Sequence, residues 1–202
     1  MHFELLVDEP SKEEALKNLV PRIIGPAHSF GIKGYEEKKL VARLRGYKRI
    51  GGSQVIVVLR DEDRKDCHQL KSRMEKMAQD GGLITKSQAR PGQNYRLINR
   101  IAIEELEAWF FGDVPALVRA YPGVPDTLAE KAPYRNPDAI SGGTWEALFR
   151  VLQKAGYYRA LRRPPKKELA RKISAHMDPD RNRSRSFQVF REALKQATQS
   201  IF

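Results

Sequence analysis

The chain has 202 residues, with 37 lysines and arginines against 25 aspartates and glutamates, and a formal net charge of +12. A chain of this length forms one domain, or one domain with an extension. Its single cysteine, Cys67, excludes an internal disulfide and a multi-cysteine metal site, and no apolar run approaches the roughly 20 residues of a membrane span. We expect a soluble, cytoplasmic protein with no membrane association. Its charge makes nucleic acid the first candidate partner, although charge alone fits a merely solvated basic surface equally well.

Strand-like and helix-like patterns alternate through the first half of the chain. Strands are expected at residues 2–7, 28–33, 54–60 and 95–103, and helices between them at about 16–23, 36–45 and 67–77. Ser11, followed three residues later by Glu14, forms a capping-box pattern and predicts that Ser11 caps the first helix. Strands separated by helices of this length are typical of βαβ units. We therefore predict an α/β, Rossmann-like fold with a mostly parallel central sheet and flanking helices.

From about Val114 onward the pattern changes to helices and loops. Helices are expected in GTWEALFRVLQKAG, PPKKELARKISAHM and SRSFQVFREALKQA. In the last of these, Phe187 and Phe190 stand three residues apart on one face and are expected in the core. We predict an α/β domain over residues 1–113 and a basic, helical C-terminal extension over 114–202 that packs on it.

Acidic residues follow three of the predicted strands. Because ligands of parallel sheets bind at the carboxyl ends of the strands, these acids are expected to converge on one edge. Two carboxylates 4 Å apart repel each other by roughly 4 kcal/mol near a protein surface, and Mg²⁺, which prefers carboxylate, water and phosphate oxygens, offsets such repulsion. The sequence therefore predicts a Mg²⁺ or Mn²⁺ site formed by Asp8, Glu9, Asp61, Asp63, Glu105 and Glu107.

Each acidic pair also has an ordinary structural explanation. Asp63 would cap the helix that follows it, Asp8 and Glu9 would form a strand-to-helix turn, and glutamates after the fourth strand would favour a helix N-terminus. For Asp61 and Asp63 alone the structural explanation is the better one. Three such placements at one sheet edge favour the metal site.

Several short motifs, taken in chain order, resemble a known family. VDEPS ends the first strand, LRDEDRKDC ends the third, and ELEAWFFGD, NPDAI, TWEAL and NRSRSF follow. This set resembles the domain-of-unknown-function family numbered 4276 over nearly the whole chain. The acids after the strands resemble the Toprim arrangement of topoisomerases, primases and nucleases of the overcoming-lysogenization-defect type. The resemblance implies a Toprim-like fold and Mg²⁺-dependent phosphodiester chemistry.

The resemblance also implies roles for individual acids. The Toprim glutamate after the first strand falls on Glu9, with Asp8 close behind as a candidate. The Toprim Asp-x-Asp falls on Asp61 and Asp63 as metal ligands. Glu107, and after it Glu105, is the candidate for a further ligand or a water-orienting base. Related stand-alone Toprim-like proteins accompany defence against phage, which implies a protein partner in a defence system.

Basic residues concentrate in the C-terminal half, in one run over residues 159–172 and a second around NRSRSF. Ser184 or Ser186 is expected to cap the last helix, whose positive end would suit a phosphate together with neighbouring arginines. Tyr157 and Tyr158 lie beside the first run, where aromatics could stack on bases. We expect nucleic-acid contacts from Lys33, Arg181, Arg183, Ser184, Arg185 and Ser186, with a solvated helix face as the alternative.

Together these features predict a divalent-metal-dependent nuclease that hydrolyses nucleic-acid phosphodiesters. A chain of 202 residues leaves no room for the gate domain of a topoisomerase or the template-binding modules of a primase. The alternative is a non-catalytic nucleic-acid-binding or defence-complex subunit whose acids are structural. A third hypothesis is phosphoryl chemistry on a small nucleotide.

Overall fold

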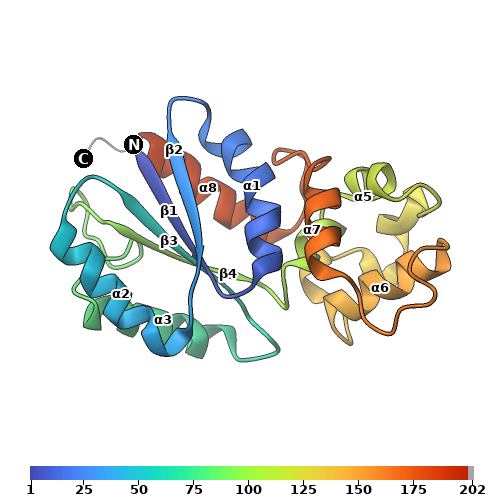
Figure 1. Cartoon of the computed structure of the whole chain (residues 1–202), viewed down its shortest axis with the longest axis horizontal. Coiled ribbons are helices and arrows are strands. Elements are labelled where there is room, and N and C mark those ends of the chain that lie inside the picture. The colour runs from blue at the N-terminus through green and yellow to red at the C-terminus, as the bar shows by residue number, and fades with distance from the viewer. Residues whose placement is uncertain (200–202) are drawn as a thin grey trace.

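The computed structural model describes residues 1–199 of the chain, and its centre is one parallel sheet (Figure 1). Its four strands are β1 (His2–Val7), β2 (Ser29–Gly34), β3 (Val55–Asp61) and β4 (Leu97–Ala102). The order across the sheet is β2-β1-β3-β4, and every neighbouring pair is parallel. The predicted α/β fold and its parallel sheet are confirmed.

Helices cover both faces of the sheet. One face carries α1 (Pro10–Ile24) and α8 (Arg185–Gln199), and the other carries α2 (Glu37–Ile50) and α3 (Cys67–Asp80). Alternate side chains of β3 enter the two cores, Val57 with the first helix pair and Val58 with the second. Because both faces are covered, the strand VIVVLRD is buried at every position, as expected for a central strand of a parallel sheet.

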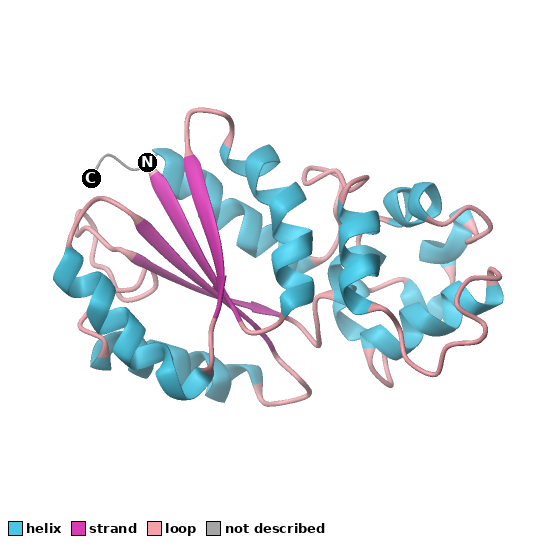
Figure 2. Cartoon of the chain, in the orientation of Figure 1, coloured by secondary structure: helices cyan, strands magenta, loops and turns pink. Residues whose placement is uncertain are grey.

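A helical lobe lies beyond the carboxyl ends of the strands (Figure 2). It contains α4 (Glu107–Phe111), α5 (Val114–Ala120), α6 (Thr144–Lys154), α7 (Lys166–Ser174) and the short 3₁₀ helices Asp126–Glu130, Ala132–Tyr134 and Pro137–Ala139. Helix α7 packs along α1: Asn18 Nδ2 donates to Ser174 Oγ at 2.9 Å, and Arg22 Nη1 donates to the Met177 carbonyl at 2.7 Å. The lobe is thereby held against the edge of the sheet where the acids were expected. None of the helices in residues 1–199 is long and apolar enough to cross a bilayer.

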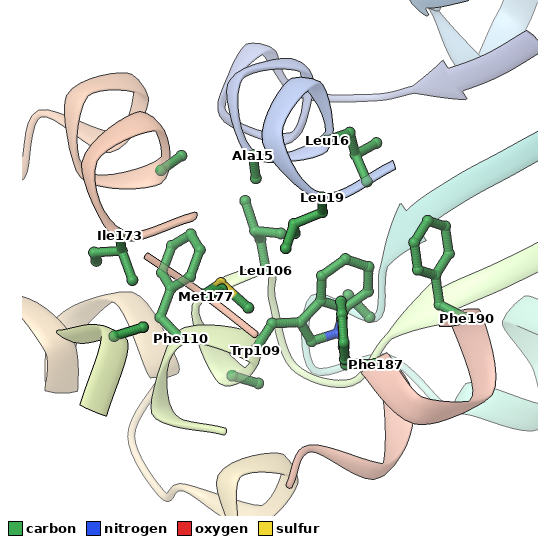
Figure 3. Packing of buried hydrophobic residues seen from close by; sticks show 14 of the residues in the cluster. Ala15, Leu16, Leu19, Leu106, Trp109, Phe110, Ile173, Met177, Phe187 and Phe190 are labelled. Atoms are coloured by element: carbon green, nitrogen blue, oxygen red, sulfur yellow. The ribbon is translucent and has the colours of Figure 1, made fainter. Parts of the chain in front are cut away.

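The last helix returns from the lobe to the sheet. Phe187 and Phe190 are fully buried against Trp109 of α4, each with its ring centroid 5.1 Å from the indole (Figure 3). Their predicted place in the core is confirmed. Trp109 Nε1 also donates to Ser186 Oγ at 2.9 Å, so the indole has a polar partner inside the core. Helix α8 contacts β4 and α1. The segment predicted as an extension over residues 114–202 therefore contributes one of the two helices that cover this face of the sheet.

Two predicted helix caps are wrong and one is confirmed. Helix α1 begins two residues earlier than the capping box implies, with Pro10 at its first position and Glu9 as N-cap, because proline is already set for a first turn. Helix α3 is capped by Asp66, whose carboxylate accepts from Gln69 N at 2.9 Å, so Asp63 is not a cap. Ser184 caps α8, its Oγ accepting from Phe187 N at 3.2 Å.

Candidate active site

The strand order creates a crevice between β1 and β3. From β1 the chain passes to β2 on one side, and from β3 it passes to β4 on the other, so the two connections diverge. Ligand sites of open parallel sheets form outside the strand ends at such a switch point. Asp8 directly follows β1, and Asp61 is the last residue of β3. Because Val7 lies opposite Leu59, the two carboxylates leave the sheet close together.

Lys12, in the first turn of α1, lies between these two aspartates. Its Nζ is 2.6 Å from Asp8 Oδ1 and 2.6 Å from Asp61 Oδ2. Lys12 is fully buried, and Asp61 is only 2% exposed. Burial favours the neutral amine, but the charges of Asp61 and Asp8 outweigh it and raise the pKa of Lys12 above its usual value. A lysine of the chain itself therefore offsets the repulsion for which the sequence suggested a metal ion.

Asp61 keeps one carboxylate oxygen without a partner. Its Oδ2 accepts from Lys12, while Oδ1 is buried and has no hydrogen-bond partner among the described residues. Burial raises the pKa of Asp61 well above its usual range, Lys12 opposes the rise, and Asp8 and Glu107 add to it. A buried oxygen with free lone pairs is rare in folded proteins and needs an explanation, such as a proton, an ion or a ligand.

Glu107, the first residue of α4, is the second buried acid of the site. It is 3% exposed. Burial raises its pKa from 4.5 to about 7; the charge of Lys166 opposes this rise, and those of Glu105 and Glu9 reinforce it. A carboxyl group with a pKa near neutrality can both accept and release a proton at physiological pH.

Lys166, the first residue of α7, brings a second positive charge, partly buried, to the acids. Its Nζ lies 3.6 Å from Glu9 Oε2 and 3.8 Å from Glu105 Oε1. It also lies 5.9 Å from the centre of the Trp145 ring, within reach of a cation–π contact. Burial alone would lower the pKa of Lys166, but Glu107, Glu9 and Glu105 together raise it. The lysine therefore stays charged among three glutamates.

Glu105 is held by the start of α6. Its Oε2 accepts hydrogen bonds from Thr144 Oγ1 and from the backbone N–H of Trp145, both at 3.1 Å. The other oxygen, Oε1, faces Lys166. Glu105 is therefore positioned through one oxygen by the start of α6 and through the other by Lys166.

Asp63 does not join Asp61. It has a left-handed backbone with φ +53°, and its N–H donates to the Glu104 carbonyl at 3.0 Å. Its carboxylate lies 3.6 Å from Lys65 Nζ and lines a neighbouring polar pocket of about 260 Å³ together with Glu104, Glu105 and Glu146. The structure thus brings Asp8, Glu9, Asp61, Glu105 and Glu107 to one edge and leaves Asp63 beside them. A metal-binding role for Asp63 stays a prediction.

No three His, Cys, Asp or Glu side chains within residues 1–199 are arranged as a ready metal site. Magnesium commonly takes only one or two carboxylates from the protein and completes its coordination with water and substrate phosphate. Two groups of the site have this donor chemistry, the free Oδ1 of Asp61 and the carboxyl group of buried Glu107. Glu107 is close enough to Asp61 to raise its pKa. These two residues fit a magnesium ion that arrives with a phosphate substrate.

A family model described as Domain of unknown function (DUF4276) matches residues 7–195. The chain belongs to the DUF4276 family. No curated protein and no solved structure gives a significant match. The part of the chain that DUF4276 covers includes every acid described above, Lys12 and Lys166, and most of α8.

In this DUF4276 protein, Asp138 occupies the position at the start of α8 where a phosphate was expected. Its carboxylate accepts from Ser184 Oγ at 2.8 Å, from Ser186 Oγ at 2.9 Å and from the Ser186 N–H at 3.1 Å. The two serines are buried, and their hydroxyls are engaged with the aspartate. Arg183 and Arg185 of the same segment are exposed. The NPDAI and NRSRSF motifs therefore form one internal contact.

Arg181 and Lys33 also have acidic partners. Arg181 donates through Nε and Nη2 to the two oxygens of buried Asp113, at 2.9 and 3.0 Å. Asp113 in turn caps α5 by accepting from Ala116 N. Lys33 Nζ lies 2.9 Å from Glu4 Oε1 at the edge strand β2. Nucleic-acid contact by these two residues stays a prediction, and both have a structural partner in the free protein.

The tyrosines next to the basic run belong to the lobe. Tyr121 and Tyr158 share a hydrogen bond of 2.8 Å between their hydroxyls, and Tyr157 Oη donates to the Pro122 carbonyl at 2.9 Å. Tyr158 also donates to Glu168 at 2.7 Å. Partly buried and bonded to one another, they hold the lobe together. The basic residues that the lobe exposes near Lys166 are Arg159, Arg162, Arg163, Lys167 and Arg171.

The sequence analysis missed the two lysines on which the site depends. Lys12 was taken for an ordinary residue of a capping box, and Lys166 for one of a long basic run. The available signal for Lys12 was its spacing: a lysine four residues after Asp8, in the first turn of the following helix, can reach back to the strand end. Nothing in the spacing of Lys166 separates it from its basic neighbours.

Proposed function

We propose that this protein is a divalent-metal-dependent nuclease with a Toprim-like site, which hydrolyses nucleic-acid phosphodiesters. The observation that carries the proposal is the gathering of acids from three strand ends around two lysines, Lys12 fully buried and Lys166 partly buried, at the switch point of a parallel sheet. Five carboxylates face two ammonium groups there. Even with Glu107 protonated, the site carries excess negative charge in a chain of net charge +12, so it favours an added cation.

Asp8, Glu9 and Asp61 lie where the Toprim resemblance leads us to expect acids, which supports the proposal, whereas Asp63 lies beside them. Glu9 and Asp8 follow the first strand, and Asp61 ends the strand beside it. We infer that Asp61, through its free Oδ1, would hold a magnesium or manganese ion together with the substrate phosphate, and that Glu107 serves proton transfer. When bound, such an ion supplies Lewis-acid polarisation of the phosphate and a more acidic water.

The chain's own residues supply the proton transfer and the orientation. Glu107, with a pKa near 7, accepts a proton from the attacking water, whose oxygen forms the new bond to phosphorus. The bond from phosphorus to the departing sugar oxygen breaks, and that oxygen takes a proton from solvent. Lys166 donates to a non-bridging phosphate oxygen. Lys12 keeps Asp8 and Asp61 in place, and Thr144 keeps Glu105 in place.

An exposed basic surface beside the acids supports a polyanionic substrate. Arg162, Arg163 and Lys167 flank the start of α7, next to Lys166. Phosphate contacts of this kind dominate the affinity for nucleic acid and make it depend steeply on salt. Exposed Arg183 and Arg185 remain candidates for further phosphate contacts.

One observation favours the alternative of a non-catalytic nucleic-acid-binding or defence-complex subunit. Lys12 already bridges Asp8 and Asp61, and an ion triad of this kind, with Lys12 and Asp61 buried, can be purely structural. On that alternative, the acids stabilise the sheet edge, and only the basic surface meets nucleic acid.

Cleavage and metal binding distinguish the two functions. We would measure cleavage of end-labelled DNA and RNA in Mg²⁺ and in Mn²⁺, and metal binding by calorimetry with and without nucleic acid. The proposal expects Glu107→Gln to lower cleavage by a factor of about 10²–10⁴, and Asp61→Asn to lose both metal binding and cleavage. Glu130→Gln, the same change at an exposed glutamate of the lobe, is the matched control. If wild-type protein binds nucleic acid but neither cleaves it nor binds metal in its presence, the nuclease proposal is wrong and the non-catalytic binding subunit is the remaining function.

A further inference from the structure

A groove runs along the free edge of the sheet at β4, apart from the acidic site. It has a volume of about 350 Å³. One wall comes from α3, with Cys67, Lys71 and Met74, and the other from α8, with Arg185 and Val189. Ile101 of β4 lies between the walls, and Val189 is one of the few large apolar side chains that are well exposed.

The backbone of β4 is unpaired where it borders this groove. Ile56 N donates to Arg96 O, and Glu62 N donates to Ala102 O, so the even-numbered residues of β4 bond β3. Alternate residues of a strand direct their N–H and C=O groups to opposite sides, and those of Asn99 and Ile101 therefore point away from β3. On that side, the backbone of the described residues pairs with β4 only at Leu97, through a bridge to Thr85. The Asn99 carbonyl accepts from Arg100 Nη1 at 2.6 Å, so the groups open to a partner strand are the N–H of Asn99 and the N–H and C=O of Ile101.

The charges around the groove identify the partner that it fits. Lys71, Arg100 and Arg185 line it, and the single acid there, Asp138, is already engaged with Ser184 and Ser186. The surface is thus apolar at its base and positive at its rim. A nucleic acid would match the charge but not the apolar base, whereas an acidic peptide with alternate apolar side chains matches both. We propose that β4 accepts an extended acidic peptide segment of a protein partner as a fifth strand, by main-chain pairing with Asn99 and Ile101.

In strand addition of this kind, backbone hydrogen bonds and side-chain contacts contribute separately to binding. The partner's main chain would bond the free N–H and C=O groups of β4, which supplies affinity. Its apolar side chains would lie on Ile101, Met74 and Val189, and its carboxylates would face Lys71 and Arg185, which supplies selectivity. An uncovered strand edge is a liability that proteins normally blunt or pair, and a dedicated partner would remove it.

Cys67 offers a direct readout because it is the only cysteine of the chain and lines the groove. We would measure the rate at which a thiol-specific reagent labels Cys67 in the full-length protein as a peptide of alternating glutamate and valine is added, and the peptide's affinity by fluorescence anisotropy. The proposal expects saturable binding and a matching slowing of labelling. The double variant Lys71→Glu/Arg185→Glu should weaken the peptide about tenfold. Arg49→Glu, an equivalent reversal on the exposed end of α2, should leave it unchanged.

Two further peptides test the mode of binding. The same sequence with alternate peptide nitrogens methylated cannot pair along the strand and should not bind, and a lysine–valine peptide should not bind either. Equal binding of the methylated peptide would overturn strand addition, and equal slowing of Cys67 labelling by the lysine peptide or by an oligonucleotide would overturn the acidic partner. Labelling of Cys67 that slows with protein concentration alone would show that a second copy of the chain fills the groove, which also overturns the proposal. Unchanged circular dichroism of the variants excludes loss of fold as the cause.

Discussion

Replacing Lys12 by methionine tests whether the candidate site depends on a lysine of the chain. The substitution removes the charge and keeps a linear, apolar side chain of similar length in a fully buried place. Asp8 and Asp61 then face each other with no ammonium group between them. Removing one member of a buried ion pair costs about 3–5 kcal/mol, because the remaining charge has lost its compensation. Ordinary domains have about 5–15 kcal/mol of stability in total, so we expect a large loss that still leaves a folded population.

The stability lost in Lys12→Met should depend on pH, and the direction of this dependence follows from the pKa of Asp61. Without Lys12, the pKa of Asp61 in the folded variant should rise still further, because burial already raises it and Lys12 is its main opposing influence. A group whose pKa is raised on folding contributes stability below its unfolded pKa and loses it as pH rises through the folded pKa. The Lys12→Met variant should therefore lose more stability at pH 8 than at pH 5, relative to wild type. Adding Asp61→Asn to the variant should restore part of the loss, with an interaction energy of about 0.5–3 kcal/mol.

Urea denaturation of the four proteins of this cycle, at both pH values, measures these quantities. Lys17→Met is the matched control, since Lys17 lies on the same helix, is largely exposed and pairs only with Glu14 at the surface. It should change the free energy of unfolding by less than about 0.5 kcal/mol. A loss below about 1 kcal/mol for Lys12→Met, with no recovery in the double variant, would refute the buried triad.

Three other predictions concern the core contacts and the second buried acid. Gly112→Ala should destabilise the protein by about 3 kcal/mol or more, because the new Cβ would lie 2.1 Å from Asn182 Oδ1 and 2.8 Å from the backbone nitrogen of Ser184. Chemical denaturation measures this loss, and a value under about 1 kcal/mol would contradict the prediction. Asp138→Ala should cost about 1–3 kcal/mol by leaving the buried hydroxyl groups and N–H at the start of α8 without their acceptor; a thermal melt equal to wild type would contradict it. Glu107 has a pKa of about 7 in the folded protein, against an ordinary value of 4.5. The free energy of unfolding of wild type, relative to that of Glu107→Gln, should therefore fall by about 3 kcal/mol as pH rises from below 4.5 to above 7. Parallel curves of stability against pH for the two proteins would contradict this.

The fold was predictable because its signals are local. Strands β1 and β3 contain apolar runs, the strands β1, β2 and β3 are each followed by a helix with an apolar face, and the spacing selects parallel βαβ units. The place of the acids followed from the same argument, since residues after the strands of a parallel sheet must meet at one edge. Asp8 and Asp61 meet there although they are far apart in the chain.

The details of the site depend on tertiary contacts that local patterns do not contain. Asp61 points into the crevice, whereas Asp63 points away from it. This difference depends on the left-handed backbone at Asp63 and on the hydrogen bond that its N–H donates to the Glu104 carbonyl. The role of NRSRSF could not be read for the same reason. Its serines look like a free helix cap, and only the folded chain brings Asp138 to them.

Lys12 also breaks a local rule in a way that points to function. It stands at the N-terminal end of α1, where the helix dipole disfavours a positive charge, and it is buried there. Glu104, after β4, breaks another rule by adopting a left-handed backbone with φ +58° although it is not a glycine. Sequences depart from local preference mainly at functional or strained sites, because elsewhere such departures only reduce stability. Both departures occur at the carboxyl edge of the sheet, where Asp61 also keeps a buried oxygen without a partner, and this coincidence is the strongest physical reason to seek the chemistry of the protein at that edge.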